Sequence, residues 1–279
     1  MSAPTPPAAP AAPTASTVPA ASGRSPGAWV VGASSGIGRA TAARLARDGY
    51  TVAVSGRRED RLAEVVREIT GQGGRALAVP VDVTGPASSL ASAYEQVVAG
   101  LDGPLEVLVC SAGTNVTNRW WSDLTPDGFD RVVDTNLGAV TRAVLTVLPG
   151  FRANGFGQVV VVSSWAGWQY MSAAGAAYSA SKTGLGALVQ TLNDQEGRSG
   201  VRATHLCPGE VATDILRTRP VPPPEEEMAR MLDPDDVAEA VGWLTGLRAK
   251  VCVNELVLTP VHNRMYVDTS AYPPRKAGA

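Results

Sequence analysis

The sequence predicts an α/β fold: a single doubly wound Rossmann-type domain, with a parallel seven-stranded sheet and helices on both faces. Short apolar runs rich in β-branched residues alternate with helical patterns along most of the chain. The first run leads into a glycine-rich turn and then a helix, which is an arrangement that binds phosphate groups. The 279 residues suffice for one sizeable domain of this kind.

Seven apolar runs supply the expected strands of this sheet. They lie at residues 29–31, 50–55, 76–81, 105–110, 159–162, 201–207 and 251–258. Helical patterns separate them at 39–48, 59–69 and 87–99, then from about 125 through Asn136 to 148, and from the segment containing Tyr178 to 196. No linker or internal repeat divides residues 27–261, which we therefore expect to form one domain.

Both ends of the chain are predicted to be tails. Residues 1–26 are rich in Ala and Pro and have little to bury, so we expect a disordered segment. They lack the basic start and continuous apolar core of a secretory signal. Residues 262–279 extend beyond the last expected strand. No window is apolar and long enough to span a membrane, and three scattered cysteines indicate buried, reduced thiols, so the expected location is cytoplasmic.

The net charge and the pattern of histidines and cysteines argue against nucleic-acid binding and against a zinc site. The formal net charge is −2, without the basic surface that nucleic-acid binding requires. Two isolated histidines and an odd number of cysteines do not form a typical zinc pattern, so no metal site is predicted. His205 is expected to be a core or strand-end residue.

The glycine-rich turn and the following strand suggest a nucleotide site. The turn reads Gly32-Ala33-Ser34-Ser35-Gly36-Ile37-Gly38, and its glycines permit close approach of a phosphate to the backbone. The alternative is a loop that merely turns the chain. The second strand ends before Arg57 and Arg58, which suit the 2′-phosphate of NADP. The alternative for these arginines is a solvated start of the next helix.

A second candidate site lies where the fifth expected strand ends. Ser164 follows that strand, and Tyr178 and Lys182 are four residues apart, on one face of the next helix. A nearby cation favours the phenolate form of tyrosine and lowers its pKa, which suits the phenol to proton transfer. Alone, a Tyr-x-x-x-Lys pair is usually ordinary helix surface.

Taken in order, these motifs resemble the short-chain dehydrogenase/reductase family, in its NADP-preferring, broad-specificity branch. The resemblance covers about residues 28–260. It is carried by Gly32-x-x-x-Gly36-Ile37-Gly38, Asp82-Val83, Ala112-Gly113, Asn136, Ser164, Tyr178-x-x-x-Lys182 and Pro208-Gly209-x-Val211-x-Thr213. Three features depart from the family pattern. Val31 stands where Thr is usual, and Cys110-Ser111 replaces two asparagines, which removes side-chain amides that would brace the central strand. Ser164 and Tyr178 are also one residue further apart than in many relatives.

The resemblance implies a role for each matching residue. Tyr178 would exchange a proton with the substrate oxygen, Ser164 would hydrogen-bond that oxygen, Lys182 would hold the nicotinamide ribose, and Asn136 would support a water chain. Ser163 remains an alternative to Ser164. The residues expected to bind NADP(H) are Gly32, Ser34, Ser35, Gly36, Ile37, Gly38, Arg57, Arg58, Asp82, Val83, Ala112, Gly113, Pro208, Gly209, Val211 and Thr213.

Substrate and assembly are less closely defined. Trp168 lies between Ser164 and Tyr178 and is expected near the substrate, with core or subunit packing as the alternative. Residues 214–232 correspond to the family's lid and are short, which suggests an open pocket. The family generally forms homodimers or homotetramers through the helices carrying Asn136 and Tyr178, and small residues at Ala180, Gly184 and Ala187 would permit close packing.

The expected function is an NADP-linked oxidoreductase that interconverts a ketone or aldehyde and an alcohol. Tyr178 would be the proton donor or acceptor, and the expected partner is a small-molecule carbonyl or alcohol substrate, with a medium or bulky carbonyl compound favoured by the open pocket. Two alternatives remain. One is an epimerase or lyase that uses bound nicotinamide without net redox change. The other is a non-catalytic NADP-binding protein, which would have no need to retain Asn136, Ser164, Tyr178 and Lys182 together.

Overall fold

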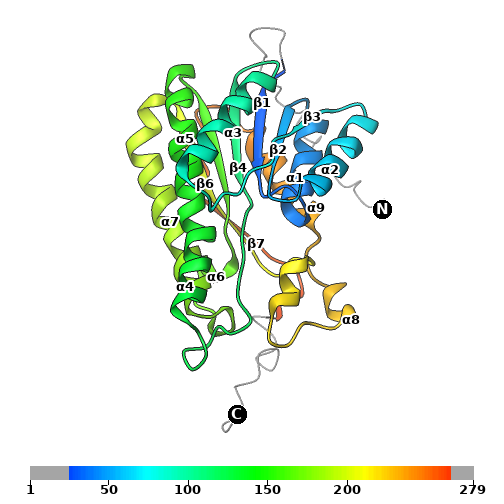
Figure 1. The fold of residues 1–279 in the computed structure, drawn as a ribbon, viewed down its shortest axis with the longest axis vertical. Coiled ribbons are helices and arrows are strands. Elements are labelled where there is room, and N and C mark those ends of the chain that lie inside the picture. Colours follow the sequence, from blue (N-terminus) through cyan, green and yellow to red (C-terminus); the bar gives the residue numbers. More distant parts are fainter. Residues whose placement is uncertain (1–24, 265–279) are drawn as a thin grey trace, which may run out of the picture.

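Seven parallel strands form one sheet in the order β3-β2-β1-β4-β5-β6-β7 in the computed structural model, which describes residues 25–264 (Figure 1). The chain starts in the middle of the sheet and winds outward in both directions, so the strand order reverses between β1 and β4. Loops that leave β1 and β4 therefore diverge at the carboxyl edge and open a crevice there. This confirms the predicted fold. The strands are β1 (Gly27–Val31), β2 (Thr51–Ser55), β3 (Arg75–Ala78), β4 (Leu105–Cys110), β5 (Gly157–Val162), β6 (Val201–Pro208) and β7 (Glu255–Leu258).

The two edge strands are shorter than predicted. The strand expected at 76–81 runs only from Arg75 to Ala78, and the carbonyl oxygen of Val79 beyond it accepts the hydroxyl of Ser55 at 2.7 Å. The N–H groups of Val79 and Val81 still donate to the carbonyl oxygens of Val54 and Gly56. The strand expected at 251–258 begins only at Glu255, since the N–H of Val251 closes a turn onto the carbonyl oxygen of Arg248.

Helices cover both faces of the sheet, as expected for parallel strands. Helices α1, α2 and α9 pack on one face, and α3, α5 and α7 pack on the other, while the short α6 and α8 lie at the carboxyl edge (Figure 1). The helices are α1 (Gly36–Arg47), α2 (Glu59–Gly71), α3 (Ala87–Gly100), α4 (Pro126–Val133), α5 (Ala139–Asn154), α6 (Trp165–Trp168), α7 (Ala176–Glu196), α8 (Glu225–Met228) and α9 (Pro234–Thr245).

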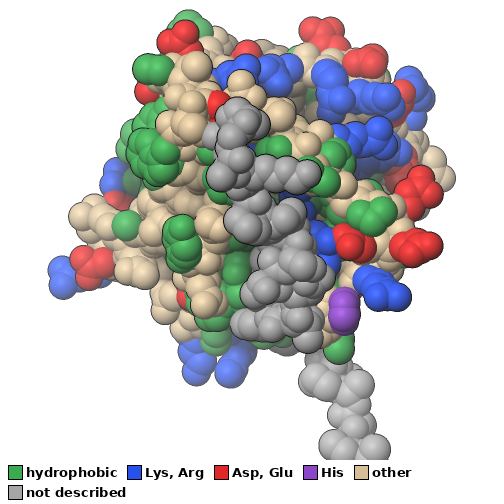
Figure 2. Space-filling model, turned by 90° about the horizontal axis from the view of Figure 1, so that it is seen from below, with side chains coloured by type: hydrophobic (Ala, Val, Ile, Leu, Met, Phe, Trp, Pro, Cys, Tyr) green, Lys and Arg blue, Asp and Glu red, His purple; other side chains and the backbone are tan. Residues whose placement is uncertain are grey.

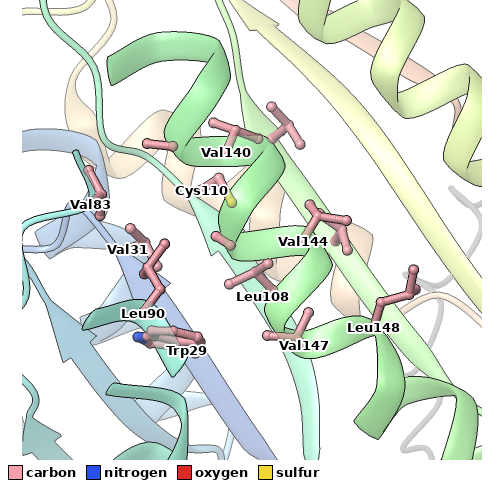
Figure 3. Packing of buried hydrophobic residues seen from close by; sticks show 14 of the residues in the cluster. Trp29, Val31, Val83, Leu90, Leu108, Cys110, Val140, Val144, Val147 and Leu148 are labelled. Atoms are coloured by element: carbon pink, nitrogen blue, oxygen red, sulfur yellow. The ribbon is translucent and has the colours of Figure 1, made fainter. Parts of the chain in front are cut away.

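The core consists of one apolar layer on each side of the sheet, because successive side chains of a strand point to opposite faces. In β1, Trp29 and Val31 pack against α3 and α5 (Figure 3), whereas Ala28 and Val30 pack against the other layer. The indole N–H of Trp29 donates to Ser55 Oγ at 2.8 Å, so this large side chain is buried with its polar atom satisfied.

A wider helical turn interrupts the helix predicted at 125–148. The structure has α4, then a π-helical turn from Asp134 to Gly138, then α5. Turns of this kind accommodate an extra residue and are frequent at functional sites. Asn136, one of the predicted site residues, lies in this turn and is fully buried. The single helix predicted around it is therefore two helices joined by a π-helical turn.

The remaining expectations concern the chain ends and the thiols. Most of the two predicted tails, residues 1–24 and 265–279, lies outside the described residues (grey in Figure 2). Within residues 25–264, no helix combines the length and apolar character needed to cross a bilayer. Cys110 and Cys207 are buried free thiols, but Cys252 is exposed and lies just before β7 rather than inside a strand.

Candidate active site

A cavity of about 880 Å³ lies at the carboxyl edge of the sheet. Segments that follow the first six strands in the sequence line it, so residues far apart in the chain meet there. Of the predicted site residues, the cavity is lined by Gly32, Ser34, Ser35, Gly36, Ile37, Arg57, Arg58, Asp82, Val83, Ala112, Gly113, Ser164, Tyr178, Lys182, Pro208, Gly209, Val211 and Thr213. Gly38, Asn136 and Trp168 are not among its lining residues.

Two glycines of the glycine-rich turn, Gly32 and Gly38, are packed too closely to carry a side chain. Gly32 has φ +88°, and a Cβ built there would lie 2.4 Å from the backbone nitrogen of Ala112. A Cβ on Gly38 would lie 2.2 Å from the carbonyl oxygen of Gly32, so Gly38 supports the turn from beneath the cavity wall. These glycines bring the N-terminus of α1 against the cavity, which is the arrangement that favours a bound anion.

The two arginines after β2 face the same turn. One terminal nitrogen of Arg58 donates to Ser34 Oγ and to Ser35 Oγ, each at 3.1 Å. The pKa of Asp82 is lowered mainly by hydrogen bonds from the N–H and hydroxyl of Thr84, and also by the charge of Arg57. Both arginines therefore line the cavity rather than simply opening α2, and Arg58 contacts the glycine-rich turn.

Tyr178 and Ser164 meet at the other end of the cavity. Ser164 is the residue before α6, and its Oγ accepts the N–H of Ala166 at 3.2 Å. Burial raises the pKa of Tyr178, whereas the hydrogen bond with Ser164 and the charges of Arg219 and Arg119 oppose that rise. A phenol in these surroundings stays protonated and available as a donor near neutral pH.

The geometry distinguishes Ser164 from the alternative, Ser163. The hydroxyl of Ser163 is buried and donates to the carbonyl oxygen of Lys182 at 3.2 Å, so it joins β5 to α7. Ser164 Oγ instead accepts the N–H of Ala166, and Ser164 lines the cavity together with Tyr178. Ser164 is thus the serine placed to share a substrate oxygen with that phenol.

Lys182 lies one helical turn beyond Tyr178, as the spacing predicts. Its Nζ is 5.6 Å from the centroid of the Tyr178 ring and donates to the carbonyl oxygen of Val162 at 3.0 Å. Burial lowers the pKa of Lys182 to about 8, although Cys207 and Cys110 oppose that change. The ammonium is therefore costly to keep charged, and Arg219 and Arg119 add positive charge beside the phenol.

Asn136 braces the cavity from behind. Its Oδ1 accepts the N–H of Thr114 at 2.8 Å, and its Nδ2 donates to the carbonyl oxygen of Thr114 and to Ser181 Oγ. These bonds join the π-helical turn to the loop after β4 and to α7. The fully buried amide thus fixes the loop that contains Gly113. The water chain that Asn136 is expected to support stays a prediction.

The tryptophan at the cavity wall is Trp165 rather than Trp168. Trp165 is buried and lines the cavity, whereas the side chain of Trp168 is 43% exposed. The two rings meet edge to face at 4.9 Å, so Trp168 supports Trp165 from outside. The sequence did not single out Trp165 for a place on the wall, and a substrate contact by Trp168 stays a prediction.

Three further residues of the cavity wall were not predicted: Arg119, Glu210 and Arg219. Arg219 donates to Glu210 Oε1 at 2.6 Å, and Arg264 donates to both oxygens of Glu210 at 2.7 Å. Glu210 occupies the variable position after Pro208-Gly209, where a buried carboxylate has no evident signal in the sequence. These charged contacts tie the lid and residue 264 to the end of β6.

A separate group of possible metal ligands lies across β6 and β7. His205 Nδ1 is 3.0 Å from Glu255 Oε2 and 3.3 Å from Cys207 Sγ. The three side chains form a hydrogen-bonded chain, and burial raises the pKa of Cys207 to about 12, which disfavours the thiolate that binds metal. His205 is buried, as expected for a core residue.

Fold and site together define a Rossmann-type oxidoreductase. Residues 27–221 match the family described as short chain dehydrogenase, and the chain belongs to this family. It is 33% identical over 238 residues to glycine betaine reductase ATRR of Emericella nidulans, with 83% of this chain but only 18% of that protein covered. This chain therefore spans less than a fifth of that relative.

Two solved structures resemble the whole domain. One is an alcohol dehydrogenase from the archaeon Thermococcus sibiricus complexed with 5-hydroxy-NADP, with 32% identity, a TM-score of 0.76, and 85% of this chain and 97% of that chain covered. The other is a variant of actinorhodin polyketide ketoreductase with NADPH, with 30% identity, a TM-score of 0.76, and 84% and 95% covered.

Proposed function

We propose that the protein is an NADP-linked oxidoreductase that interconverts a ketone or aldehyde and the corresponding alcohol, with Tyr178 as the proton donor and acceptor. One observation carries this proposal. Ser164 and Tyr178 line the same cavity as the glycine-rich turn and its two arginines. Carbonyl reduction needs these two parts, a proton donor and a dinucleotide site, in one cavity.

The described residues fit NADP(H). The turn has no space for a side chain at Gly32 or Gly38 and presents the start of α1 to an anion. Arg58 donates hydrogen bonds to the hydroxyls of Ser34 and Ser35. A bound 2′-phosphate would accept hydrogen bonds from the same guanidinium, in place of these hydroxyls or in addition to them. Two solved relatives with NADP-type ligands, the alcohol dehydrogenase and the ketoreductase, support the same choice.

The protein supplies proton transfer and positioning, while bound nicotinamide supplies or accepts the hydride. In the reductive direction, Ser164 and Tyr178 would both donate hydrogen bonds to the carbonyl oxygen and thereby polarise it. The phenol of Tyr178 would then give its proton to that oxygen as negative charge develops. Arg119, Arg219 and Lys182 would stabilise the phenolate that remains.

The direct test is turnover with a panel of aldehydes, ketones and alcohols, followed by the absorbance of the reduced nicotinamide. We expect stoichiometric oxidation of NADPH with at least one carbonyl compound, and equal amounts of alcohol formed. A change of configuration or bond cleavage without net nicotinamide oxidation would instead indicate the epimerase or lyase alternative. Binding of NADPH without any reaction across the panel would indicate the binding protein.

Replacing both Arg57 and Arg58 with Ala is expected to weaken NADPH binding about 10- to 100-fold, because charge-assisted bonds to a phosphate are lost. NADH binding should change much less, since NADH has no 2′-phosphate. Dissociation constants measured by calorimetry for both nucleotides give the comparison. The control is Arg61→Ala on the exposed side of α2, where Arg61 pairs with Glu64 outside the cavity. Equal losses for NADPH and NADH would contradict the assignment.

We also propose that the protein assembles as a homodimer or homotetramer through α4, α5 and α7. Ala180 and Ala187 are exposed on α7, and Leu145 of α5 is 63% exposed. Light scattering at micromolar concentration should give a mass of two or four chains, and a monomer mass would overturn this proposal.

The free thiols of Cys110, Cys207 and Cys252 support a reducing, cytoplasmic location.

A further inference from the structure

An ion pair outside the cavity joins two segments that line it. One terminal nitrogen of Arg142, on α5, donates to Asp134 Oδ1 at 2.8 Å, and the other donates to the carbonyl oxygen of Val83 at 3.0 Å. Asp134 begins the π-helical turn, and Val83 lies in the loop after β3. Both of these residues line the cavity, whereas Arg142 does not. One side chain thus connects two stretches of the cavity wall.

Close packing fixes the position of this guanidinium. Gly138 leaves the space for it, since a Cβ there would lie 2.7 Å from Asp134 Oδ1 and 3.2 Å from a terminal nitrogen of Arg142. The Nε of Arg142 is buried and has no hydrogen-bond partner among the described residues. A buried donor without a partner is costly, so the guanidinium is stabilised mainly through the two bonds of its terminal nitrogens.

The loop after β3 is held through both a side chain and its main chain. Val83 is 7% exposed and packs in the same apolar layer as Val31 (Figure 3). Next to it, Asp82 Oδ1 accepts the N–H of Thr84 at 3.0 Å and its hydroxyl at 2.7 Å, which closes a turn. Arg142 supplies the partner for the carbonyl oxygen of Val83. The protein itself therefore fixes the backbone of this loop.

This loop lies at the adenosine end of the proposed nucleotide site. The pKa of Asp82 is lowered mainly by the hydrogen bonds from Thr84 and also by the charge of Arg57, so Arg57 is close to the loop. Arg57 and Arg58 are the residues proposed for the 2′-phosphate, which NADP carries on its adenosine ribose. The loop, and the π-helical turn that the ion pair connects to it, therefore form the part of the wall next to the adenosine.

We propose that Arg142 is a positioning residue for the adenosine half of the dinucleotide. It keeps Val83 and Asp134 in the places that the nucleotide needs, so that neither segment has to be ordered on binding. The inference rests on the proposed function in one respect, the assignment of NADP(H) to the cavity. Arg142 does not touch the reacting atoms, and it acts only through the two segments that it bonds.

The test measures binding of the adenosine half alone. Arg142→Met keeps much of the apolar stem but makes neither hydrogen bond. It should weaken binding of adenosine 2′,5′-bisphosphate about 5- to 20-fold, because the ligand must then order the loop and the turn. NADPH should lose affinity by the same factor, since it contains the same half. Calorimetry gives the dissociation constants and the stoichiometry. The matched control is Arg152→Met, because Arg152 also lies on α5 and pairs with the carboxylate of Glu196, outside the cavity.

A purely structural role of Arg142 predicts a different result. Partial unfolding would lower the stoichiometry and leave the dissociation constant of the folded fraction unchanged, which would overturn the proposal. Unchanged affinity in Arg142→Met, an equal loss in Arg152→Met, or a loss confined to NADPH would also overturn it. Arg142→Lys keeps the charge and can bond one of the two partners, so it should recover part of the affinity.

Hydrogen exchange without nucleotide measures the loop directly. The N–H groups of Thr84 and Gly85 donate to Asp82 and are the reporters. A peptide that covers them should exchange at least about 5-fold faster in Arg142→Lys than in the natural chain, while peptides from α1 should exchange alike. If Arg142→Met does not fold, this comparison still decides. Equal exchange of the loop, or faster exchange throughout the chain, would overturn the proposal.

Neither measurement requires turnover, so the results separate this inference from the proposed function. If a carbonyl compound is reduced but Arg142→Met binds both nucleotides normally, the oxidoreductase assignment stands and this inference fails. If Arg142→Met binds adenosine 2′,5′-bisphosphate more weakly but no carbonyl compound is reduced, this inference stands and the oxidoreductase assignment fails. A natural chain that binds neither nucleotide would overturn both.

Discussion

Tyr178→Phe should lower kcat by about 10²- to 10⁴-fold, the range that general acid–base groups usually contribute. The substitution removes only the phenolic oxygen, so the ring can keep its packing beside Lys182. Binding of NADPH should remain nearly unchanged, because the contacts proposed for the nucleotide lie mostly at the glycine-rich turn. Steady-state turnover with an accepted carbonyl compound and calorimetric titration with NADPH give the two measurements.

Tyr170→Phe is the matched control for this variant. Tyr170 lies in the segment that leads into α7, the helix of Tyr178, but it is 85% exposed and outside the cavity lining. It should keep the natural rate. If Tyr178→Phe also kept that rate, the phenol would not be the proton donor, and the proposed mechanism would be wrong.

Lys182→Met should change how stability depends on pH. Burial lowers the pKa of Lys182 from 10.5 to about 8 in the folded protein. Between these values the unfolded chain binds a proton that the folded chain does not, so this group makes stability rise with pH. Below pH 8 the folded protein keeps a buried charge and carries the full penalty. Without nucleotide, the natural chain should therefore gain about 2 to 3 kcal/mol relative to the variant between about pH 7 and pH 10.

Urea unfolding of both proteins at a series of pH values measures this difference. The comparison cancels the titration of Cys110, Cys207 and Tyr178, which both chains contain and which otherwise lowers stability at high pH. Lys250→Met, at an exposed position, should show no such dependence. A constant difference between the natural chain and Lys182→Met would mean that Lys182 titrates alike in both states.

The order of the motifs was sufficient to predict the fold and much of the cavity wall. Periodic apolar runs and glycine turns are local signals, and parallel strands necessarily place their carboxyl ends at one edge. Hence Gly32, Arg58, Ser164 and Tyr178 could be predicted to meet without knowledge of side-chain packing. The limits of β3 and β7 could not, because they depend on hydrogen bonds that the apolar pattern does not indicate, such as that of Ser55 to Val79 and the turn from Arg248 to Val251.

The residues that were missed depend on tertiary packing. Arg119 lies in a loop without periodicity, and its place at the wall follows from the space beside Gly175 and from bonds to the lid. Glu210 becomes significant only when Arg219 and Arg264 approach it across the fold. Trp165 and Trp168 are three residues apart in one short helix, so composition alone could not decide which ring faces the cavity.

The strand order has a consequence for how the chain folds. Because β1 sits between β2 and β4, the nucleotide pocket requires segments from residue 32 to residue 213 to be in place together. Such non-local contacts form late and make folding slow. A nucleotide that binds only the finished pocket would stabilise the complete domain by about 2.7 kcal/mol at about 100 times its dissociation constant, and partly folded chains would gain nothing. Supply of the dinucleotide would thus set the lifetime of the protein as well as its rate of turnover.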